Sequence, residues 1–319
     1  MGHRGHRQVL GLVVVLALLG GACRDNGDDA GRPTSAAGKE SPTTAAAPDW
    51  RPVDASLGRP GDAMPGGVQR YSFPRSDLKV SLDGVALQAG FALGSYAAFL
   101  PTAEGSLVMG DLVLTEPEVG PVMSKLQEHG LDVTAVHNHL LREQPKVMYV
   151  HYAGHNADPA ALARGVRAAL EASATPLGAP STSAPQGDLG FDPAELDRIL
   201  GRTGKTSGGL HKYSIGRAEP VTMGTTPLPP ATGVATVINF QPLGAGRAAI
   251  TGDFALLGPE VAAVTRTLRA KGVDVTAVHS HMTDDNPHLY YMHFFAAAPA
   301  TELARALRAA LDQTNSAKS

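Results

Sequence analysis

Hydrophobic and polar positions along the chain follow one order of strand-like and helix-like spacing, and that order occurs twice. In the first pass, stretches rich in apolar residues at 92–100 and 107–114 predict two strands. Apolar residues then fall at i, i+3, i+4 and i+7 over 119–126, which predicts a helix, and Gly130 is placed to end it. The first half of the unit is therefore two strands followed by a helix.

The second half of the unit is another pair of strands and a closing helix. One strand is predicted through 132–139, and after a proline-containing turn a second strand runs through 149–151. Asp158-Pro159 is a helix start signal, and the apolar residues spaced four apart up to Leu170 share one face. Helices on one face of an antiparallel sheet make an α+β fold.

The second pass lies at an offset of 142 residues, as between His137 and His279; no gap is needed between 110 and 151, and the match continues upstream with a one-residue shift. The run from Asp132 to His137 recurs letter for letter as Asp274 to His279. The sequence therefore predicts two tandem homologous ββαββα-type repeats, with antiparallel sheets and helices on one face.

Composition marks the boundaries of these repeats. Residues 24–48 are mostly Gly, Ala, Ser, Thr, Pro and Asp, which is typical of a disordered tether, and 172–187 has the same character. The predicted organisation is a lipoprotein signal peptide at 1–23, the tether at 24–48, a first repeat domain at 49–171, a linker at 172–187 and a second repeat domain at 188–315.

Residues 1–23 indicate export. Arg4 and Arg7 form a positive n-region, and Val9 to Leu19 is an apolar h-region too short for a comfortable membrane span. Cys23, the sole cysteine, resembles the lipidated cysteine of a lipobox, although Gly20 stands where that pattern has Leu or Val. The alternative is a secreted protein with a free thiol, which is a liability in an oxidising compartment. We expect an exported protein that is lipid-anchored to the outer face of the cell membrane.

Charge narrows the range of partners. The formal net charge of -3 and the pI near 6.4 give no bulk attraction to nucleic acid. The expected partners are the membrane, through the lipid anchor, and an envelope partner or a small molecule.

Histidines carry the candidate chemistry. The chain has 12 histidines, and six of them occupy matched positions in the two copies. Four others face a different residue in the opposite copy, so the comparison singles out the matched set. That set is His137, His139, His151, His279, His281 and His293.

Strand geometry makes this set a candidate metal site. His137 and His139 point to the same face of a strand, and pairing of His137 opposite His151 would bring three imidazoles together, with Tyr149 opposite His139. Three neutral imidazoles suit Zn, Cu, Ni or Fe(II) and leave a coordination position open. The alternative is a hydrogen-bonded polar layer in which the histidines are structural.

Carboxylates at matched positions supply further candidates. Glu143 and its counterpart Asp285 follow the second histidine of each copy, in a His-x-His-x3-Glu spacing that resembles the first metal motif of cupins. Glu118 and Glu260 are identical in the two copies. Thr115 could form a capping box with Glu118, but Leu257 stands in its place in the second copy, so capping is not expected to explain both glutamates. These four acids are the candidates for a general base.

Second-shell roles are expected for another set of matched residues, which would hold imidazole N–H groups in place. The set is Tyr149, Tyr291, Asp111 and Asp253.

The run Gly110-Asp-Leu-Val-Leu-Thr-Glu-Pro-Glu-Val, with His137-Asn-His-Leu-Leu-Arg-Glu-x-Pro and Tyr149-x-His151, resembles the actinobacterial lipoprotein family named after the mycobacterial proteins LppY and LpqO. His279-Ser-His-Met-Thr-x-Asp-x-Pro is similar to the other repeat of that family. The resemblance extends over about residues 50 to 315 and implies a cell-envelope lipoprotein, without implying an activity.

The leading hypothesis is an envelope lipoprotein that binds a divalent transition metal through a three-histidine cluster in each repeat, with two related sites or one shared between the copies. One alternative is a metal-dependent hydrolase or oxygenase, in which an open metal position activates water or dioxygen. The other is an interaction module for an envelope partner, with structural histidines. Whether the protein is an enzyme is left open by the sequence.

Overall fold

A computed structural model describes residues 48–178 and 188–318, which form one compact unit. The predicted signal peptide, the lipidation site at Cys23, nearly all of the tether and the second part of the linker lie outside the described residues. Their assignment stays a prediction.

The first repeat contains the predicted strands and helices and several further elements. Its elements are α1 (Arg51–Leu57), β1 (Asp62–Met64), the 3-10 helix η1 (Pro65–Gly67), β2 (Val68–Pro74), β3 (Ser81–Leu82), β4 (Val85–Ala86), α2 (Ala89–Ala92), β5 (Gly94–Thr102), β6 (Gly105–Thr115), α3 (Glu116–Glu128), β7 (Asp132–His137), β8 (Val147–Asn156) and α4 (Pro159–Glu171).

The second repeat follows the same order. Its elements are α5 (Pro193–Leu200), β9 (Lys205–Ser207), β10 (Leu210–Ile215), β11 (Thr222–Met223), β12 (Thr226–Pro227), the 3-10 helix η2 (Pro230–Thr232), β13 (Thr236–Gly244), β14 (Arg247–Leu256), α6 (Gly258–Ala270), β15 (Asp274–His279), β16 (Asp285–Asn286), β17 (Tyr290–Pro299) and α7 (Ala300–Leu311).

Each repeat builds one six-stranded antiparallel sheet. The strand order is β1-β2-β5-β6-β8-β7 in the first repeat and, in the corresponding direction, β9-β10-β13-β14-β17-β15 in the second. The predicted α+β class with antiparallel sheets and two similar halves is confirmed. The predicted ββαββα unit is extended at its start, because each repeat also has an N-terminal helix and two strands that complete the sheet, α1-β1-β2 and α5-β9-β10.

The predicted helix signals act as expected. The side chain of Asp158 accepts the N–H of Ala160 at 2.9 Å and so caps α4. Gly130 and Gly272 follow α3 and α6 with φ of 70° and 74°, a left-handed conformation that favours glycine at the end of a helix.

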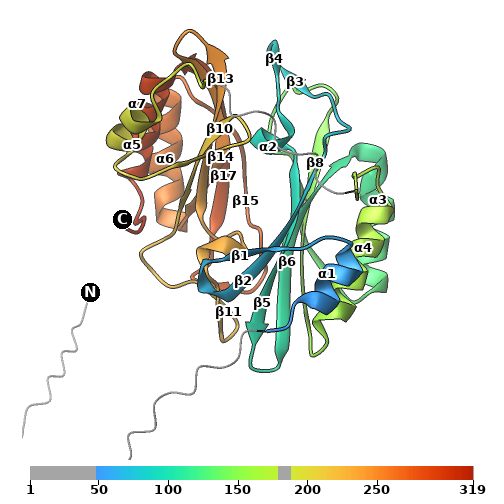
Figure 1. Cartoon of the computed structure of the whole chain (residues 1–319). Coiled ribbons are helices and arrows are strands. Elements are labelled where there is room, and N and C mark those ends of the chain that lie inside the picture. The colour runs from blue at the N-terminus through green and yellow to red at the C-terminus, as the bar shows by residue number, and fades with distance from the viewer. Residues whose placement is uncertain (1–47, 179–187, 319) are drawn as a thin grey trace, which may run out of the picture. The chain divides into compact units, whose positions relative to one another are not determined.

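The two sheets pack face to face between two outer layers of helices (Figure 1). Helices α1, α3 and α4 cover one sheet, and α5, α6 and α7 cover the other. Strand β6 is consequently buried on both faces, from residue 106 to residue 114. Its even-numbered residues pack under the helices, as Leu112 does, and its odd-numbered residues, such as Met109, face the other repeat.

Two apolar clusters join the repeats, and both contain side chains from both sheets. One includes Met109 of the first repeat and Met282 of the second, and the other includes Tyr149 of the first and Phe295 of the second. Residues at matched positions of the two repeats belong to different clusters: Tyr149 lies in one cluster and its counterpart Tyr291 in the other. The repeats are therefore related by an approximate twofold axis that passes between the clusters.

The start of the predicted linker packs on the first repeat. The side chain of Thr175 is buried, and the carbonyl of Gly178 accepts a hydrogen bond from Arg59. The composition of 172–187 indicated a disordered connection, but the part up to 178 is ordered because its backbone is hydrogen-bonded to the repeat.

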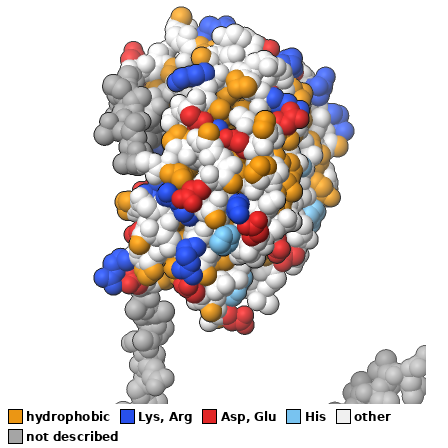
Figure 2. All heavy atoms as spheres, turned by 90° about the vertical axis from the view of Figure 1, so that its right-hand side faces the viewer, with side chains coloured by type: hydrophobic (Ala, Val, Ile, Leu, Met, Phe, Trp, Pro, Cys, Tyr) orange, Lys and Arg blue, Asp and Glu red, His pale blue; other side chains and the backbone are white. Residues whose placement is uncertain are grey.

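The outer face of the first repeat, over α1, α3 and α4, carries acidic and basic side chains interspersed with apolar ones (Figure 2). Within residues 48–178 and 188–318, no helix has both the length and the apolar composition needed to cross a membrane.

Candidate metal centre

The first and third matched histidines of each repeat lie on neighbouring strands at the sheet edge. In the first repeat His137 is opposite Tyr149, and Ala135 is opposite His151. The second repeat has the same register, with His279 opposite Tyr291. The prediction that His137 would oppose His151 is wrong by two residues. A shift of two keeps both imidazoles on one face, because side-chain direction has a period of two in a strand.

The second histidine of each repeat lies beyond the strand, since β7 ends at His137 and β15 at His279. The ring of His139 stacks on Tyr149 with centroids 3.3 Å apart, and that of His281 stacks on Tyr291 at 3.4 Å. Each tyrosine ring thus packs against the second histidine of its own repeat and holds that histidine against the face of the sheet.

The two sets of three histidines meet at the interface between the sheets and form one six-histidine cluster. In three cross-repeat ring pairs the centroids are 3.5 to 3.8 Å apart, and this set of pairs stays the same when the two repeats are exchanged. The pairs are His137 with His279 at 3.5 Å, His139 with His293 at 3.8 Å, and His151 with His281 at 3.8 Å.

Nitrogen atoms of the cluster converge in two overlapping groups. One group is formed by His137, His139 and His151, and the other joins His137 to the three histidines of the second repeat. Within each group the ligand atoms lie within 4.8 Å of one another. Two nitrogens bound ~2.0–2.1 Å from one ion are at most ~4.2 Å apart, so small side-chain shifts suffice for coordination.

Backbone carbonyls fix which nitrogen is available. The Nδ1–H groups of His137, His279 and His293 donate to the carbonyls of Asn138, Ser280 and Gly252, at 3.0, 3.2 and 3.1 Å. A carbonyl only accepts, so these Nδ1 atoms carry the proton and the Nε2 lone pairs point into the cluster. This is the second-shell arrangement that orients metal-bound imidazoles.

Several Nε2 atoms have no hydrogen-bond partner among the residues that the structure describes. Those of His137, His139, His151 and His281 are buried without a hydrogen-bond partner. The Nε2 atoms of His279 and His293 lie 2.8 Å apart. Because both of these rings donate through Nδ1, their Nε2 lone pairs face each other with no hydrogen between them, and a cation at this position would relieve the repulsion.

The imidazoles are held in the neutral form that binds metals. Burial, followed by the neighbouring His279, lowers the pKa of His137 from 6.5 to about 3. Burial lowers the pKa of His279 to about 4. The pKa values of the other four are lowered well below 6.5 by burial and by neighbouring histidines.

Asp111 is buried beside the cluster, and Asp253 is half-buried opposite His293 in the neighbouring strand. Oδ2 of Asp111 is 3.8 Å from Nε2 of His139, and its Oδ1 is 3.9 Å from Nε2 of His151. Burial, with Asp253 as a further cause, raises the pKa of Asp111 to about 8, and burial raises that of Asp253 to about 7. Asp111 was expected in the second shell, but it faces the Nε2 atoms, on the side where ligands converge.

Glu118 and Glu260 are placed elsewhere, at the N-termini of α3 and α6. Each carboxylate accepts the N–H of the residue before its helix at 2.7 Å, from Thr115 and Leu257 respectively. The inference that capping cannot explain both glutamates is wrong. The glutamate of a capping box binds a backbone N–H, which Leu257 also provides.

Both glutamates also hold a buried arginine. Arg75 lies 2.8 Å from Glu118 and Arg217 lies 2.8 Å from Glu260, and the arginine side chains are 1% and 2% exposed. These carboxylates are committed to ion pairs on the helix side of the sheets, which accounts for their identity in the two copies without a binding role.

Glu143 and Asp285 organise the turns between the paired strands. Asp285 accepts the N–H of Leu289 at 2.7 Å and pairs with Nδ1 of His288 at 2.8 Å. Glu143 accepts the equivalent N–H, that of Val147, and burial raises the pKa of Glu143. Among the described residues neither acid belongs to the converging nitrogen groups, so the cupin-like spacing does not produce a carboxylate ligand here.

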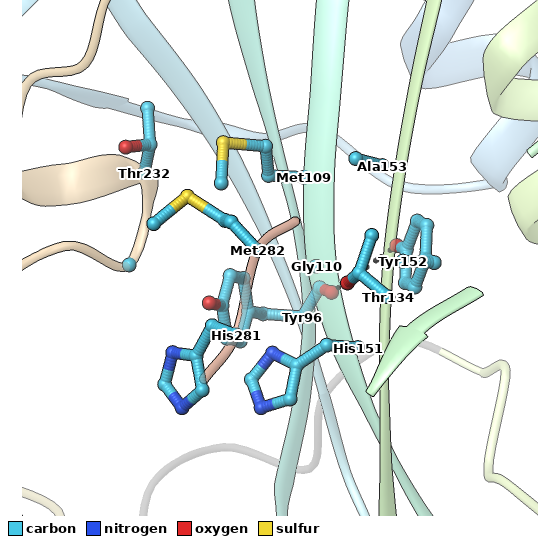
Figure 3. Close-up of a pocket in the computed structure, with 11 residues that line it drawn as sticks. Tyr96, Met109, Gly110, Thr134, His151, Tyr152, Ala153, Thr232, His281 and Met282 are labelled. Atoms are coloured by element: carbon cyan, nitrogen blue, oxygen red, sulfur yellow. Dashed lines mark hydrogen bonds between the residues drawn. The ribbon is translucent and has the colours of Figure 1, made fainter. Parts of the chain in front are cut away.

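A small pocket opens beside His151 and His281, which lie next to each other in Figure 3. Tyr96, Met109 and Met282 also line it. Sequence reasoning missed these three residues. They come from strands and turns far apart in the chain, and the copies differ there, so neither spacing nor internal comparison marks them.

Comparison with known proteins identifies the repeat. A family model described as Domain of Unknown Function (DUF1259) matches the chain twice, over residues 51–172 and 194–313. No curated protein matches the chain.

Solved structures add no further information. A trimeric bacterial microcompartment shell protein, PduB, matches at 13% identity over 79% of this chain and 89% of that chain, with a TM-score of 0.20. EtuB from Clostridium kluyveri matches at 12% identity over 79% and 90%, with a TM-score of 0.18. TP0453 matches at 11% identity over 70% and 81%, with a TM-score of 0.17. Scores this low carry no argument about fold or function.

Proposed function

The chain belongs to the family of unknown function DUF1259, in two copies, and from that premise we propose that it is an exported, lipid-anchored protein that binds a divalent transition metal in the six-histidine cluster. The metal is Zn, Cu, Ni or Fe(II), since these ions prefer imidazole nitrogen. The group of four histidines takes ligands from both repeats, so this part of the proposed site requires the two sheets to be packed together.

The unpaired Nε2 atoms carry this proposal. A structural polar layer pairs its buried nitrogens, and each buried polar atom left unpaired costs ~1–3 kcal/mol. Four Nε2 atoms in one cluster lack a partner within residues 48–178 and 188–318, and two more face each other at 2.8 Å. A cation bound by either nitrogen group would give the facing nitrogen atoms of that group a partner, whereas structural histidines leave them unexplained.

A catalytic role is not part of the proposal. The four acids considered as general bases are engaged by arginines or by backbone N–H groups. No other observation favours the hydrolase or oxygenase alternative over metal binding.

Metal analysis tests the central claim. Protein purified without a polyhistidine tag is expected to contain stoichiometric transition metal, and His137→Ala is expected to lose most of it, because His137 belongs to both nitrogen groups. His155→Ala is the matched control, since His155 is an exposed histidine bonded to Thr102. Metal-free wild-type protein that binds none of these ions on titration would refute the proposal.

The envelope location rests on Arg4, Arg7, the apolar stretch from Val9 to Leu19, and Cys23, together with the resemblance to the LppY and LpqO lipoproteins. Cells fed labelled palmitate are expected to label the wild-type protein, and Cys23→Ser is expected to remove both the label and the membrane association. Equal labelling of the two proteins would contradict lipidation at Cys23.

A further inference from the structure

One carboxylate oxygen beside the six-histidine cluster is buried and unpaired. Asp111 is 5% exposed, and its Oδ1 makes no hydrogen bond within the part of the chain that the structure describes. The Nε2 atoms of His139 and His151 are buried without a partner in the same way. Buried polar atoms are normally paired, so an unpaired oxygen beside two unpaired nitrogens indicates a binding site.

Strand pairing brings Asp111 to these two histidines. Asp111 in β6 is directly opposite His151 in β8. Its Oδ1 lies 3.9 Å from Nε2 of His151, and its Oδ2 lies 3.8 Å from Nε2 of His139. Both separations are too long for a hydrogen bond, but two donor atoms bound ~2.0–2.2 Å from one ion are at most ~4.3 Å apart. The three side chains could therefore hold one ion with little movement.

Charge points to a cation at this position. Among the described residues, His139 and His151 are the only basic side chains within ion-pair distance of the Asp111 oxygens. Neutral imidazoles do not compensate an ionised carboxylate in the interior, and they do not compensate a buried divalent ion either. A divalent ion between Asp111 and the two rings gives each charge an opposite partner.

The matched aspartate of the second repeat is placed differently. Asp253 is half-buried, and its Oδ1 accepts the N–H of Val237 at 3.3 Å. Within residues 48–178 and 188–318, Asp111 is the aspartate whose oxygens come within ion-pair distance of the cluster. The two aspartates are therefore identical in sequence but not in position, and Asp253 serves as a control for Asp111.

We propose that Asp111 is itself a metal ligand and binds the ion together with His139 and His151. The inference rests on the proposed metal site and adds an anionic ligand to it. The rings of His293 and His281 stack on these two histidines, so the second repeat packs against the same site. Two imidazoles and a carboxylate are typical ligands of non-haem Fe(II), and Zn(II) also accepts them, whereas Cu(I) prefers sulfur.

Co(II) binding tests the role of Asp111. Asp111→Asn removes the negative charge but keeps the shape, and it is expected to weaken Co(II) binding at least about tenfold. Loss of a residue that only orients a ligand also weakens binding ~10–100-fold, so affinity alone does not identify a ligand. The visible absorption bands of bound Co(II) are therefore measured too, and they are expected to shift in Asp111→Asn. Asp253→Asn is expected to match wild type in both measurements.

Infrared difference spectroscopy provides a second measurement that needs no Asp111 variant. Addition of Co(II) to chelator-treated wild-type protein is expected to shift a carboxylate stretching band, because an oxygen of Asp111 becomes a ligand. Asp253→Asn is expected to show the same shift. This measurement decides the question if Asp111→Asn fails to fold.

The outcomes separate the two proposals. Wild-type protein that binds no transition metal refutes the metal site itself. Metal-loaded wild-type protein without a carboxylate shift overturns the role of Asp111 alone. Asp111→Asn protein with unchanged Co(II) bands also overturns it, whether binding is weaker or not, because unchanged bands mean an unchanged set of ligands.

Discussion

His137, His279 and His293 each commit one ring nitrogen to a backbone carbonyl and direct the other inward. The carbonyls thereby select the tautomer before any ion arrives, which reduces the reorganisation that binding requires. The free-energy cost of this arrangement is carried by the metal-free protein, in which the neutral imidazole rings stay buried side by side.

The metal-free protein is expected to lose stability in acid. The pKa values of His137 and His279 fall from 6.5 to about 3 and about 4. Between pH 6.5 and about 4 the unfolded chain therefore binds protons that the folded chain does not, and each such histidine removes ~1.4 kcal/mol per pH unit as the pH falls. Urea denaturation of chelator-treated protein at pH 5 and 6.5 measures this loss.

Asp111 and Asp253 act in the opposite direction. Their pKa values rise from 3.8 to about 8 and about 7, so the folded protein keeps protons that the unfolded chain releases above pH 3.8. Above pH 6.5 only this effect remains, and stability is expected to fall again toward pH 8. An optimum near pH 6.5 is the expected result, and equal stability at pH 5, 6.5 and 8 would contradict it.

The two tyrosines beside the cluster provide a matched pair. The Tyr149 hydroxyl donates to the carbonyl of Ala92 at 2.7 Å, whereas the buried Tyr291 hydroxyl lacks a partner among the described residues. Tyr149→Phe is expected to lower the free energy of unfolding of the metal-free protein by ~1 kcal/mol, and Tyr291→Phe is expected not to lower it. Equal losses in urea denaturation would show that the hydroxyls are equivalent.

At the scale of the elements, helices α3 and α6 are anchored to their sheets by the same device. The glutamate in the first helical turn binds a buried arginine that follows β2 in the first repeat and β10 in the second, and that arginine also donates to a strand carbonyl. The two repeats thus have the same glutamate at this position because it stabilises the fold in each of them.

Glu118→Ala is expected to destabilise the protein by ~3–5 kcal/mol, because it leaves the Arg75 guanidinium buried with fewer partners. Glu116→Ala is the control, since Glu116 is an exposed residue of the same helical turn. Metal content is expected to stay unchanged in folded Glu118→Ala protein. Loss of metal without loss of stability would instead place Glu118 in the site.

At the scale of the whole molecule, the cluster connects the two sheets. An ion bound by His137 and the three histidines of the second repeat would have ligands from both repeats. Its binding is expected to stabilise both repeats by mass action, with ~2.7 kcal/mol gained at a free-metal concentration of 100 Kd. Hydrogen exchange is expected to slow in β8 and β17 together when metal is added.

His279→Ala extends this test across the interface. It changes only the second repeat, but it is expected to abolish the metal-dependent protection of β8 in the first repeat as well. Protection of β8 that survives in this variant would indicate independent sites in the two repeats.

The sequence by itself determined the duplication, the helices and strands around the histidines, and the six matched positions. These features depend on local spacing and on comparison of the two copies, both of which can be read without coordinates. Capping signals such as Asp158 are equally local, since the side chain binds a backbone N–H two residues away.

Only the tertiary structure decided the strand register, the meeting of the two sets of histidines and the roles of the glutamates. Alternation specifies which face a side chain occupies, but it does not specify its cross-strand partner, so His137 was placed opposite the wrong residue. The contact of His137 with His279 depends on how two sheets pack, and the pairing of Glu118 with Arg75 joins residues 43 positions apart. Such long-range contacts leave no periodic trace in the chain, because they are set by the packing of whole layers.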